Sequence, residues 1–248
     1  MDVETLVGRK WSELRQEARA FVASAPPAAC TLAMEWYGHT AWEVRMFAVL
    51  VLGGLAAHDP RALAYLRASC GQDPAWQVNE GLAMAFDDYC AAIGYEEALP
   101  VIQDWLRAPS PNLRRAVSEG LRPWTASKRT YFALHPDAAI ELLGTLKDDE
   151  SRYVQESVGN ALRDISRRHF EAVLTALRAW IDENPGSQSR RTIAKYALEQ
   201  AVKVDPSLRQ LFAPASCGDV QPCRMFGSSP SSPPKPTTSG RSDVPRER

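Results

Sequence analysis

Several features that define large classes of proteins are missing from this sequence of 248 residues. The longest apolar run, Met46 to Ala57, has 12 residues, whereas a membrane-spanning helix needs about 20. No secretory signal opens the chain, and the five cysteines are odd in number and form no CxxC pair. We therefore expect a reduced, cytoplasmic protein without a disulfide framework and without a membrane partner.

Motifs for metal and phosphate chemistry are also missing. The four histidines are scattered without the spacing of metal ligands, so we expect no metal site. The sequence contains neither a Gly-rich phosphate loop nor a nucleophile elbow. These absences argue against a metal or nucleophilic-cysteine enzyme, and we expect no cofactor.

What the sequence does contain is a helical segment that recurs. LRRAVSEGLRPW (113–124) and VQESVGNALRDI (154–165) align with apolar residues at i, i+4 and i+8, and similar segments begin at Val44 and Val78. The four starts lie 34, 35 and 41 residues apart. A helical unit with this period and little strand signal predicts an all-α fold, an α-solenoid of stacked helix pairs.

Prolines and capping residues divide the rest of the chain into helices. We expect one repeat domain over 1–213 and a disordered, Pro- and Ser-rich tail over 214–248. An insertion at 125–135 is expected to form a loop with a short helix. The expected helices are 3–24, 28–38, 42–55, 61–69, 76–89, 95–107, 113–122, 136–146, 152–168, 170–183 and 188–202.

Charge is distributed unevenly along the chain, although the net charge is only −1. Residues 1–100 hold 7 Lys and Arg against 13 Asp and Glu, a net of −6, and residues 101–195 hold 15 against 12, a net of +3. The second half is therefore the better place for an anionic partner.

The second helices of the pairs share a charged face opposite their apolar stripe. Counted from each repeat start, positions 2, 6, 9 and 10 lie on this face, and in stacked pairs such faces line a concave groove. A simpler interpretation is that these positions form only the wet side of each helix, with Glu119 and Arg122 as an i, i+3 pair. The charged or polar residues at these positions are Glu80, Arg115, Glu119, Arg122, Glu156, Asn160, Arg163 and Asp164.

These segments resemble a known family. LRRAVSEGLRPW, the stretch from LKDDESRYVQESVGNALRDI onward and SRRTIAKYAL are similar to the bacterial DNA alkylation repair family of HEAT-like glycosylases, the AlkC/AlkD group, with the AlkC branch closer. The resemblance covers residues 76–198. It implies a right-handed superhelix of HEAT-like helix pairs around a concave groove for double-stranded DNA. It also implies hydrolysis of the N-glycosidic bond of a cationic alkylated base such as 3-methyladenine.

The resemblance also implies roles for individual residues. Its acidic positions map onto Glu80, Glu119 and Asp164 as catalytic carboxylates, although a one-residue shift would put Asn79 in the place of Glu80. Carboxylates suit this chemistry because they stabilise an oxocarbenium-like sugar and orient a water molecule. An indole attracts a cationic base, and basic side chains hold phosphates. The DNA-binding residues are therefore expected to be Trp76, Arg115, Arg122, Arg190, Arg191 and Lys195.

A second hypothesis is a non-catalytic HEAT-repeat module that binds DNA structures or a protein partner, because a fold does not fix a function. The acidic first half and the small net charge favour it. The two hypotheses differ in base release, which the module lacks. In either case we expect a monomer, and the sequence does not decide whether the base is flipped.

Overall fold

The computed structural model describes residues 1–24, 26–123 and 134–213, which belong to one compact unit, Met1–Ala215. Its described residues form α-helices and short 3₁₀-helices without a strand, which confirms the predicted all-α class. None of the described helices combines the length and apolar character that crossing a membrane requires. In chain order the elements are η1 (Val3–Leu6), α1 (Trp11–Ala23), α2 (Ala29–Trp36), α3 (Trp42–Leu55), α4 (Pro60–Ala68), η2 (Cys70–Gln72), α5 (Trp76–Ile93), α6 (Tyr95–Leu106), α7 (Pro111–Gly120), α9 (Pro136–Gly144), α10 (Arg152–Glu183), α11 (Gln188–Ala197), η3 (Ala201–Lys203) and η4 (Pro206–Leu211).

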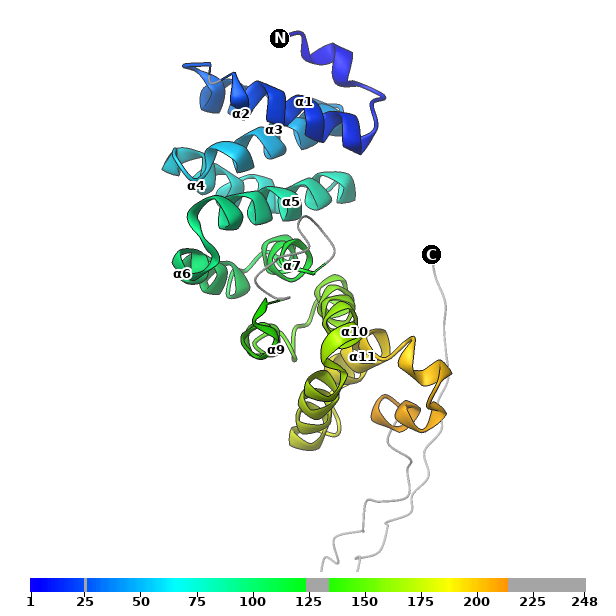
Figure 1. Ribbon diagram of the computed structural model, residues 1–248. Helices are drawn as coiled ribbons and strands as arrows, with labels where there is room; N and C mark the ends of the chain where they lie inside the picture. Colours follow the sequence, from blue (N-terminus) through cyan, green and yellow to red (C-terminus); the bar gives the residue numbers. More distant parts are fainter. Residues whose placement is uncertain (25, 124–133, 214–248) are drawn as a thin grey trace, which may run out of the picture. The chain divides into compact units, whose positions relative to one another are not determined.

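The helices stack as pairs in the order of the sequence (Figure 1). One row consists of α1, α3, α5, α7, α10 and α11, each packed on the next, while α2, α4, α6 and α9 flank it. The four repeat starts, Val44, Val78, Leu113 and Val154, are at most 2 % exposed. The apolar period of the sequence thus predicts the row of second helices correctly.

Glycine allows neighbouring helices of this row to approach closely. A Cβ atom on Gly120 of α7 would collide with the backbone of Ala83 in α5, and one on Gly159 of α10 would collide with α11 at Ile193 and Tyr196. Because the helices are this close, side chains beside these glycines face the next helix rather than solvent.

Several expected boundaries are wrong. The helix expected over 3–24 is interrupted, because Gly8 has a φ of +79° and its N–H donates to the Glu43 carboxylate. By contrast, the break expected at residue 169, between helices over 152–168 and 170–183, is confirmed, because His169 inside α10 has non-helical dihedral angles (φ −129°, ψ 51°). The helix expected over 188–202 ends at Ala197. Most of the insertion expected at 125–135 and the whole tail expected from 214 lie outside the described residues.

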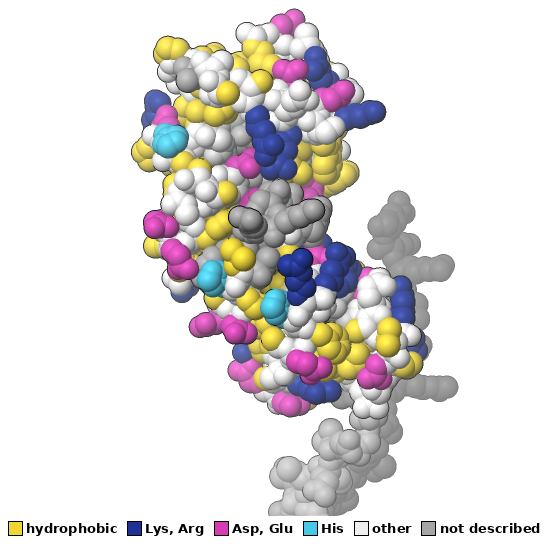
Figure 2. All heavy atoms as spheres, in the orientation of Figure 1, with side chains coloured by type: hydrophobic (Ala, Val, Ile, Leu, Met, Phe, Trp, Pro, Cys, Tyr) yellow, Lys and Arg dark blue, Asp and Glu magenta, His cyan; other side chains and the backbone are white. Residues whose placement is uncertain are grey.

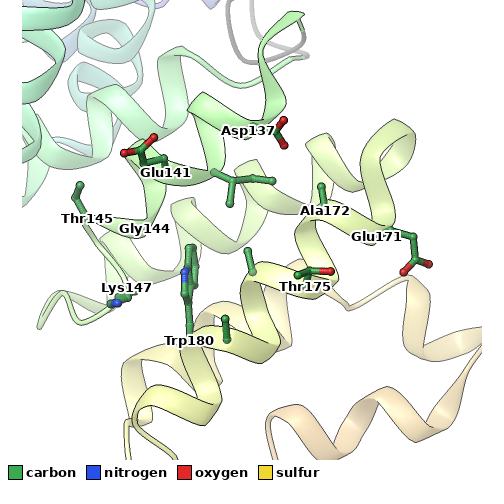
Figure 3. A pocket seen from close by; sticks show the side chains of 12 residues that line it. Asp137, Glu141, Gly144, Thr145, Lys147, Glu171, Ala172, Thr175 and Trp180 are labelled. Atoms are coloured by element: carbon green, nitrogen blue, oxygen red, sulfur yellow. The ribbon is translucent and has the colours of Figure 1, made fainter.

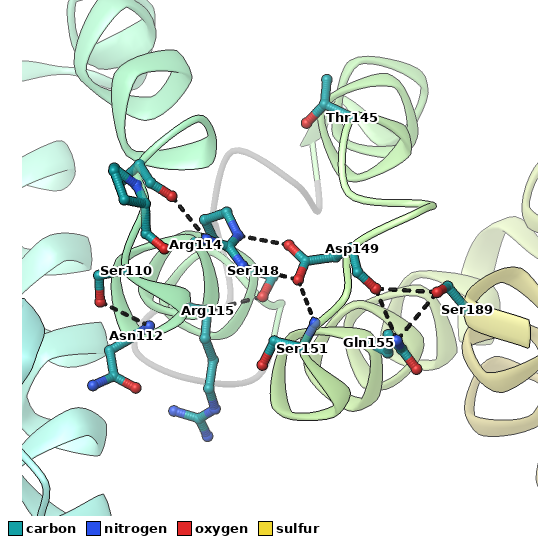
Figure 4. Close-up of polar contacts among 12 residues, drawn as sticks. Ser110, Asn112, Arg114, Arg115, Ser118, Thr145, Asp149, Ser151, Gln155 and Ser189 are labelled. Carbon is teal, nitrogen blue, oxygen red and sulfur yellow. Dashed lines mark hydrogen bonds and ion pairs between the residues drawn. The ribbon is translucent and has the colours of Figure 1, made fainter.

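A repeated arginine–aspartate pair ties the layers together (Figure 4). Arg114 of α7 donates from Nε and Nη2 to Asp149, at 2.6 and 2.9 Å, in the loop before α10. Arg45 of α3 binds Asp73, before α5, in the same way at 2.8 and 3.2 Å. Each arginine follows its repeat start by one residue and also donates to two backbone carbonyls of the loop that precedes its own helix. This device fixes how α3 sits on α5 and how α7 sits on α10.

A buried carboxyl group in α5 makes stability depend on pH. Asp87 is 2 % exposed, and burial raises its pKa to about 6, although the Tyr95 hydroxyl donates to it at 2.7 Å. Unfolding lets this carboxyl ionise at its ordinary, lower pKa, so the folded state loses stability as the pH rises from about 4 to above 6. We expect Asp87→Asn to raise the free energy of unfolding by about 1–3 kcal/mol at pH 8 and by much less at pH 4.

Urea unfolding at the two pH values measures this effect. Asp88→Asn is the control, because Asp88 is an ion-pair partner of Arg15 at 3.2 Å and should give no gain in stability. An equal effect of Asp87→Asn at both pH values would contradict the assignment of a protonated carboxyl.

Candidate functional site

Three side chains from consecutive second helices meet on the row. Arg115 of α7 donates from Nη2 to Glu80 of α5, and its guanidinium carbon lies 4.3 Å from the centre of the Tyr153 ring of α10. We call these residues the Glu80–Arg115–Tyr153 cluster. Trp76 begins α5, one turn before Glu80, and is 57 % exposed, with its ring 5.4 Å from that of Trp11. The structure thus brings two of the expected residues, Glu80 and Arg115, into contact, with Trp76 on the helix that carries Glu80.

Two adjacent arginines of α7 serve different purposes. Successive helical residues point about 100° apart, so Arg114 turns toward Asp149 whereas Arg115 extends the other way (Figure 4). The ion pair of Arg114 is part of the layer contact. Arg115 is therefore the arginine of this helix that belongs to the candidate site.

The cluster contains polar atoms that no described residue satisfies. Arg115 Nη1 and the Tyr153 hydroxyl are buried and lack a hydrogen-bond partner within the described part of the chain. A buried unpaired polar group costs about 1–3 kcal/mol, so an incoming oxygen acceptor at this place is favourable. Burial raises the pKa of Tyr153, Arg115 partly offsets this effect, and Glu80 and Glu119 add to it. Tyr153 therefore remains a neutral hydrogen-bond donor at physiological pH.

Glu119, Arg122 and Asp164 lie elsewhere than expected. Their side chains are 6 %, 7 % and 3 % exposed, and they form a buried ion-pair chain between α7 and α10. Arg122 binds Glu119 through Nη1 and Asp164 through Nε and Nη2, at 2.9 and 2.8 Å. The expectation of a wet groove face at these positions is wrong, because the close approach of α7 and α10 turns them toward each other. The i, i+3 pair of Glu119 and Arg122 exists, but inside the protein.

This buried chain reaches the cluster. The second carboxylate oxygen of Glu119 accepts a hydrogen bond from Ser157 at 2.9 Å and lies 3.7 Å from Arg115 Nη2. Charges alternate from Asp164 through Arg122 and Glu119 to Arg115 and Glu80. Through Glu119, this buried ion-pair chain therefore helps to hold Arg115 in place.

The three basic residues of α11 that were expected to bind DNA phosphates differ in how exposed and how strongly paired they are. Arg190 is 5 % exposed and is bound to Asp148 at 2.6 Å and Glu183 at 2.8 Å, so its guanidinium is already paired with carboxylates. The phosphate contact expected there stays a prediction. Arg191 donates to the carbonyls of Pro185 and Gly186. Lys195 is exposed, as a phosphate contact requires.

Tyr153 and Arg152 were missed by the sequence analysis. Tyr153 stands one residue before the repeat start Val154, outside the positions assigned to the charged face. The sequence pattern that could have identified Tyr153 is an aromatic residue in the first turn of a second helix, as with Trp76 in α5. The pattern that could have identified Arg152 is its i, i+4 spacing from Glu156, with which it forms an ion pair at 2.7 Å.

A pocket of about 720 Å³ lies away from this cluster (Figure 3). It lies between α9 and the second half of α10, with Asp137, Glu141, Glu171 and Trp180 among its lining residues. None of the expected site residues lines it. On the face drawn in Figure 2, basic side chains occur in separate groups with acidic ones among them. This face therefore carries local basic clusters rather than one basic stripe.

Comparisons with known proteins agree on one group. A family model described as DNA alkylation repair enzyme matches residues 2–201. The crystal structure of AlkD2 from Streptococcus mutans is 38 % identical, covers 79 % of this chain and 92 % of its own, and has a TM-score of 0.72. A structure of the Pseudomonas fluorescens alkylpurine DNA glycosylase AlkC, bound to DNA containing an abasic site analog, is 23 % identical and has a TM-score of 0.50. The match covers 85 % of this chain and 66 % of AlkC.

A further relative is the uncharacterized protein YhaZ of Bacillus subtilis, which is 30 % identical over 114 residues. This match covers 43 % of this chain and 32 % of the length of YhaZ. Of the two solved structures, AlkD2 has the higher identity, so the expected closer likeness to AlkC has no support.

Proposed function

The chain belongs to the DNA alkylation repair enzyme family, and from this premise we propose that it is a DNA glycosylase. Its substrate would be double-stranded DNA that carries a cationic alkylated base of the 3-methyladenine type. It would hydrolyse the N-glycosidic bond of that base. The observation that carries the proposal is the Glu80–Arg115–Tyr153 cluster, a carboxylate beside unsatisfied hydrogen-bond donors.

The chemistry requires little acid catalysis. A base that is already cationic leaves as a neutral molecule when the bond between its nitrogen and C1′ breaks, so it needs no proton. The positive charge then lies on the sugar, where the carboxylate of Glu80 stabilises it. A water molecule adds to C1′, and its proton passes to Glu80 and then to solvent. Glu80 suits this role because its side chain is 19 % exposed, against 6 % for Glu119 and 3 % for Asp164.

The neighbouring residues would hold the DNA. Arg115 Nη1 and the Tyr153 hydroxyl would donate to phosphate or sugar oxygens, which satisfies both atoms. The exposed indole of Trp76 would lie against the cationic base. Glu119, Arg122 and Asp164 would act through Arg115 as positioning residues, because they are buried and paired with one another.

One observation favours the alternative of a DNA-binding module without catalysis. Arg115 already neutralises Glu80 in the structure, and a neutralised carboxylate stabilises a cationic sugar less well. In this alternative the cluster would recognise a DNA structure and leave its bases in place. Base release therefore separates the two functions.

We expect the protein to release 3-methyladenine or a similar cationic base from methylated duplex DNA faster than spontaneous depurination. Chromatographic separation of the released bases measures this, with unmethylated duplex as the control. Binding of the methylated duplex by folded protein without any release above the spontaneous rate would favour the binding module instead.

A further inference from the structure

A second cluster of similar composition lies one layer further along the row. Arg152 of α10 donates from Nε to Glu156 at 2.7 Å and from Nη1 to Thr192 of α11 at 3.1 Å. Its guanidinium carbon lies 5.6 Å from the ring centre of Tyr196, whose hydroxyl donates to the same Glu156 oxygen at 2.8 Å. We call these residues the Arg152–Glu156–Tyr196 cluster. It repeats the combination of an arginine, a tyrosine of the next second helix and a carboxylate.

The two clusters differ in how accessible the arginine is. The Arg115 side chain is 9 % exposed, whereas that of Arg152 is 55 % exposed. Arg152 donates to Glu156 through Nε and to Thr192 through Nη1, and the Tyr196 hydroxyl also lies at the guanidinium. The guanidinium of Arg152 is thus oriented by its neighbours and still open to an anion.

Further positive charge surrounds this arginine. Burial raises the pKa of the Glu156 carboxyl, but hydrogen bonds from Arg152 and Tyr196 outweigh this effect, so the net shift is downward. The exposed Lys195 is close enough to contribute to the lowering. The cluster with Lys195 therefore holds two cations against one anion. Arg152 is also the first residue of α10, whose N-cap residue Ser151 provides no side-chain cap. The N-terminus of this helix adds partial positive charge.

We propose that Arg152 and Lys195 bind a backbone phosphate of duplex DNA, and that Tyr196 and Glu156 are positioning residues for Arg152. The proposal rests on the DNA-binding part of the proposed function and not on catalysis. An arginine held by a ring and a carboxylate loses less conformational freedom when it binds a phosphate.

One duplex can reach both clusters. Tyr153 of the first cluster and Arg152 of the second are adjacent in α10. The clusters are one helix layer apart, and packed helices lie about 8–10 Å apart, which corresponds to the rise of about two to three base pairs along the DNA axis. The second cluster would therefore hold the backbone beside the base that the first cluster addresses.

The salt dependence of binding to an undamaged 20-base-pair duplex tests this assignment, with fluorescence anisotropy across a KCl series. We expect Arg152→Ala to reduce the magnitude of the slope of log K against log salt by about 0.9, the value for one phosphate contact, and to weaken binding about tenfold near 100 mM salt. Lys195→Ala should act in the same direction. Tyr196→Phe, which loses the hydrogen bond to Glu156, should weaken binding about two- to threefold and leave the slope unchanged.

Arg67→Ala is the matched control, since Arg67 of α4 is 44 % exposed and is similarly bound to a carboxylate, Asp104, at 2.6 Å. An Arg152→Ala protein with the slope and affinity of the Arg67→Ala protein would overturn the proposal, and so would a wild-type protein that does not bind the duplex. Because the duplex is undamaged, the expected loss in Arg152→Ala would support the phosphate contact even if the protein released no base. That outcome would remove only the catalytic part of the proposed function.

Discussion

Glu80→Gln is expected to lower the rate of base release about 100- to 1000-fold, the range seen when one transition-state contact is removed. The amide keeps the shape of the side chain but carries no charge to stabilise the cationic sugar and accepts no proton from water. Affinity for undamaged duplex should remain or increase, because a negative charge near the DNA is lost. Single-turnover release from methylated duplex, with binding measured in parallel, gives both quantities.

Glu96→Gln is the control for this variant, since Glu96 is exposed in α6. It should leave the release rate unchanged. A Glu80→Gln protein that releases bases at the wild-type rate would show that Glu80 takes no part in the reaction. The neighbouring Asn79 could not replace Glu80, because Asn79 is 6 % exposed and carries no charge.

Asp149→Ala is expected to lower the free energy of unfolding by about 3–5 kcal/mol, the usual loss when one partner of a buried ion pair is removed. Asp149 has a 4 % exposed side chain and accepts both Arg114 nitrogens as well as the Ser151 N–H. Without it the guanidinium of Arg114, itself only 17 % exposed, lacks its counter-charge. Urea unfolding followed by circular dichroism at 222 nm measures the loss.

The Arg67–Asp104 pair provides the contrast. Its side chains are 44 % and 50 % exposed, so Asp104→Ala should cost less than about 1 kcal/mol. The double variant Asp149→Ala/Arg114→Met should recover part of the stability, because it removes the unpaired charge. Equal losses for Asp149→Ala and Asp104→Ala would contradict the role of the arginine–aspartate pairs in holding the layers together.

The row of second helices could be predicted from the sequence because burial follows the helical period within each segment. Val78 and Val154, for example, share a position and are both fully buried. The break at His169 could be predicted too, between helices over 152–168 and 170–183. The positive φ of Gly8, which interrupts the first helix, could not, because a single glycine inside a helical period does not by itself mark a turn.

The candidate site was only partly predictable. A helical period identifies the face of a helix but does not reveal the helix that covers it. Glu119 and Asp164 therefore seemed to line a groove, whereas the packing of α7 on α10 buries them against Arg122. Tyr153 was missed for a related reason, because its contact with Arg115 joins two layers 38 residues apart in the sequence.

The buried chain has a consequence for the two carboxylates that the sequence analysis named together with Glu80. Glu119→Gln should loosen both Arg115 and Arg122, which Glu119 contacts, and Asp164→Asn should act mainly by loosening Arg122. Their effect on base release should therefore accompany a loss of stability, in contrast to that of Glu80→Gln.

The most direct test of this account compares single-turnover release of 3-methyladenine from methylated duplex by wild type, Glu80→Gln and Glu119→Gln, each normalised to the folded fraction from its unfolding curve. The account predicts release by the wild type, a loss of about 100-fold or more in Glu80→Gln, and a smaller loss in Glu119→Gln after normalisation. Release that persists in Glu80→Gln but is abolished in folded Glu119→Gln would contradict it.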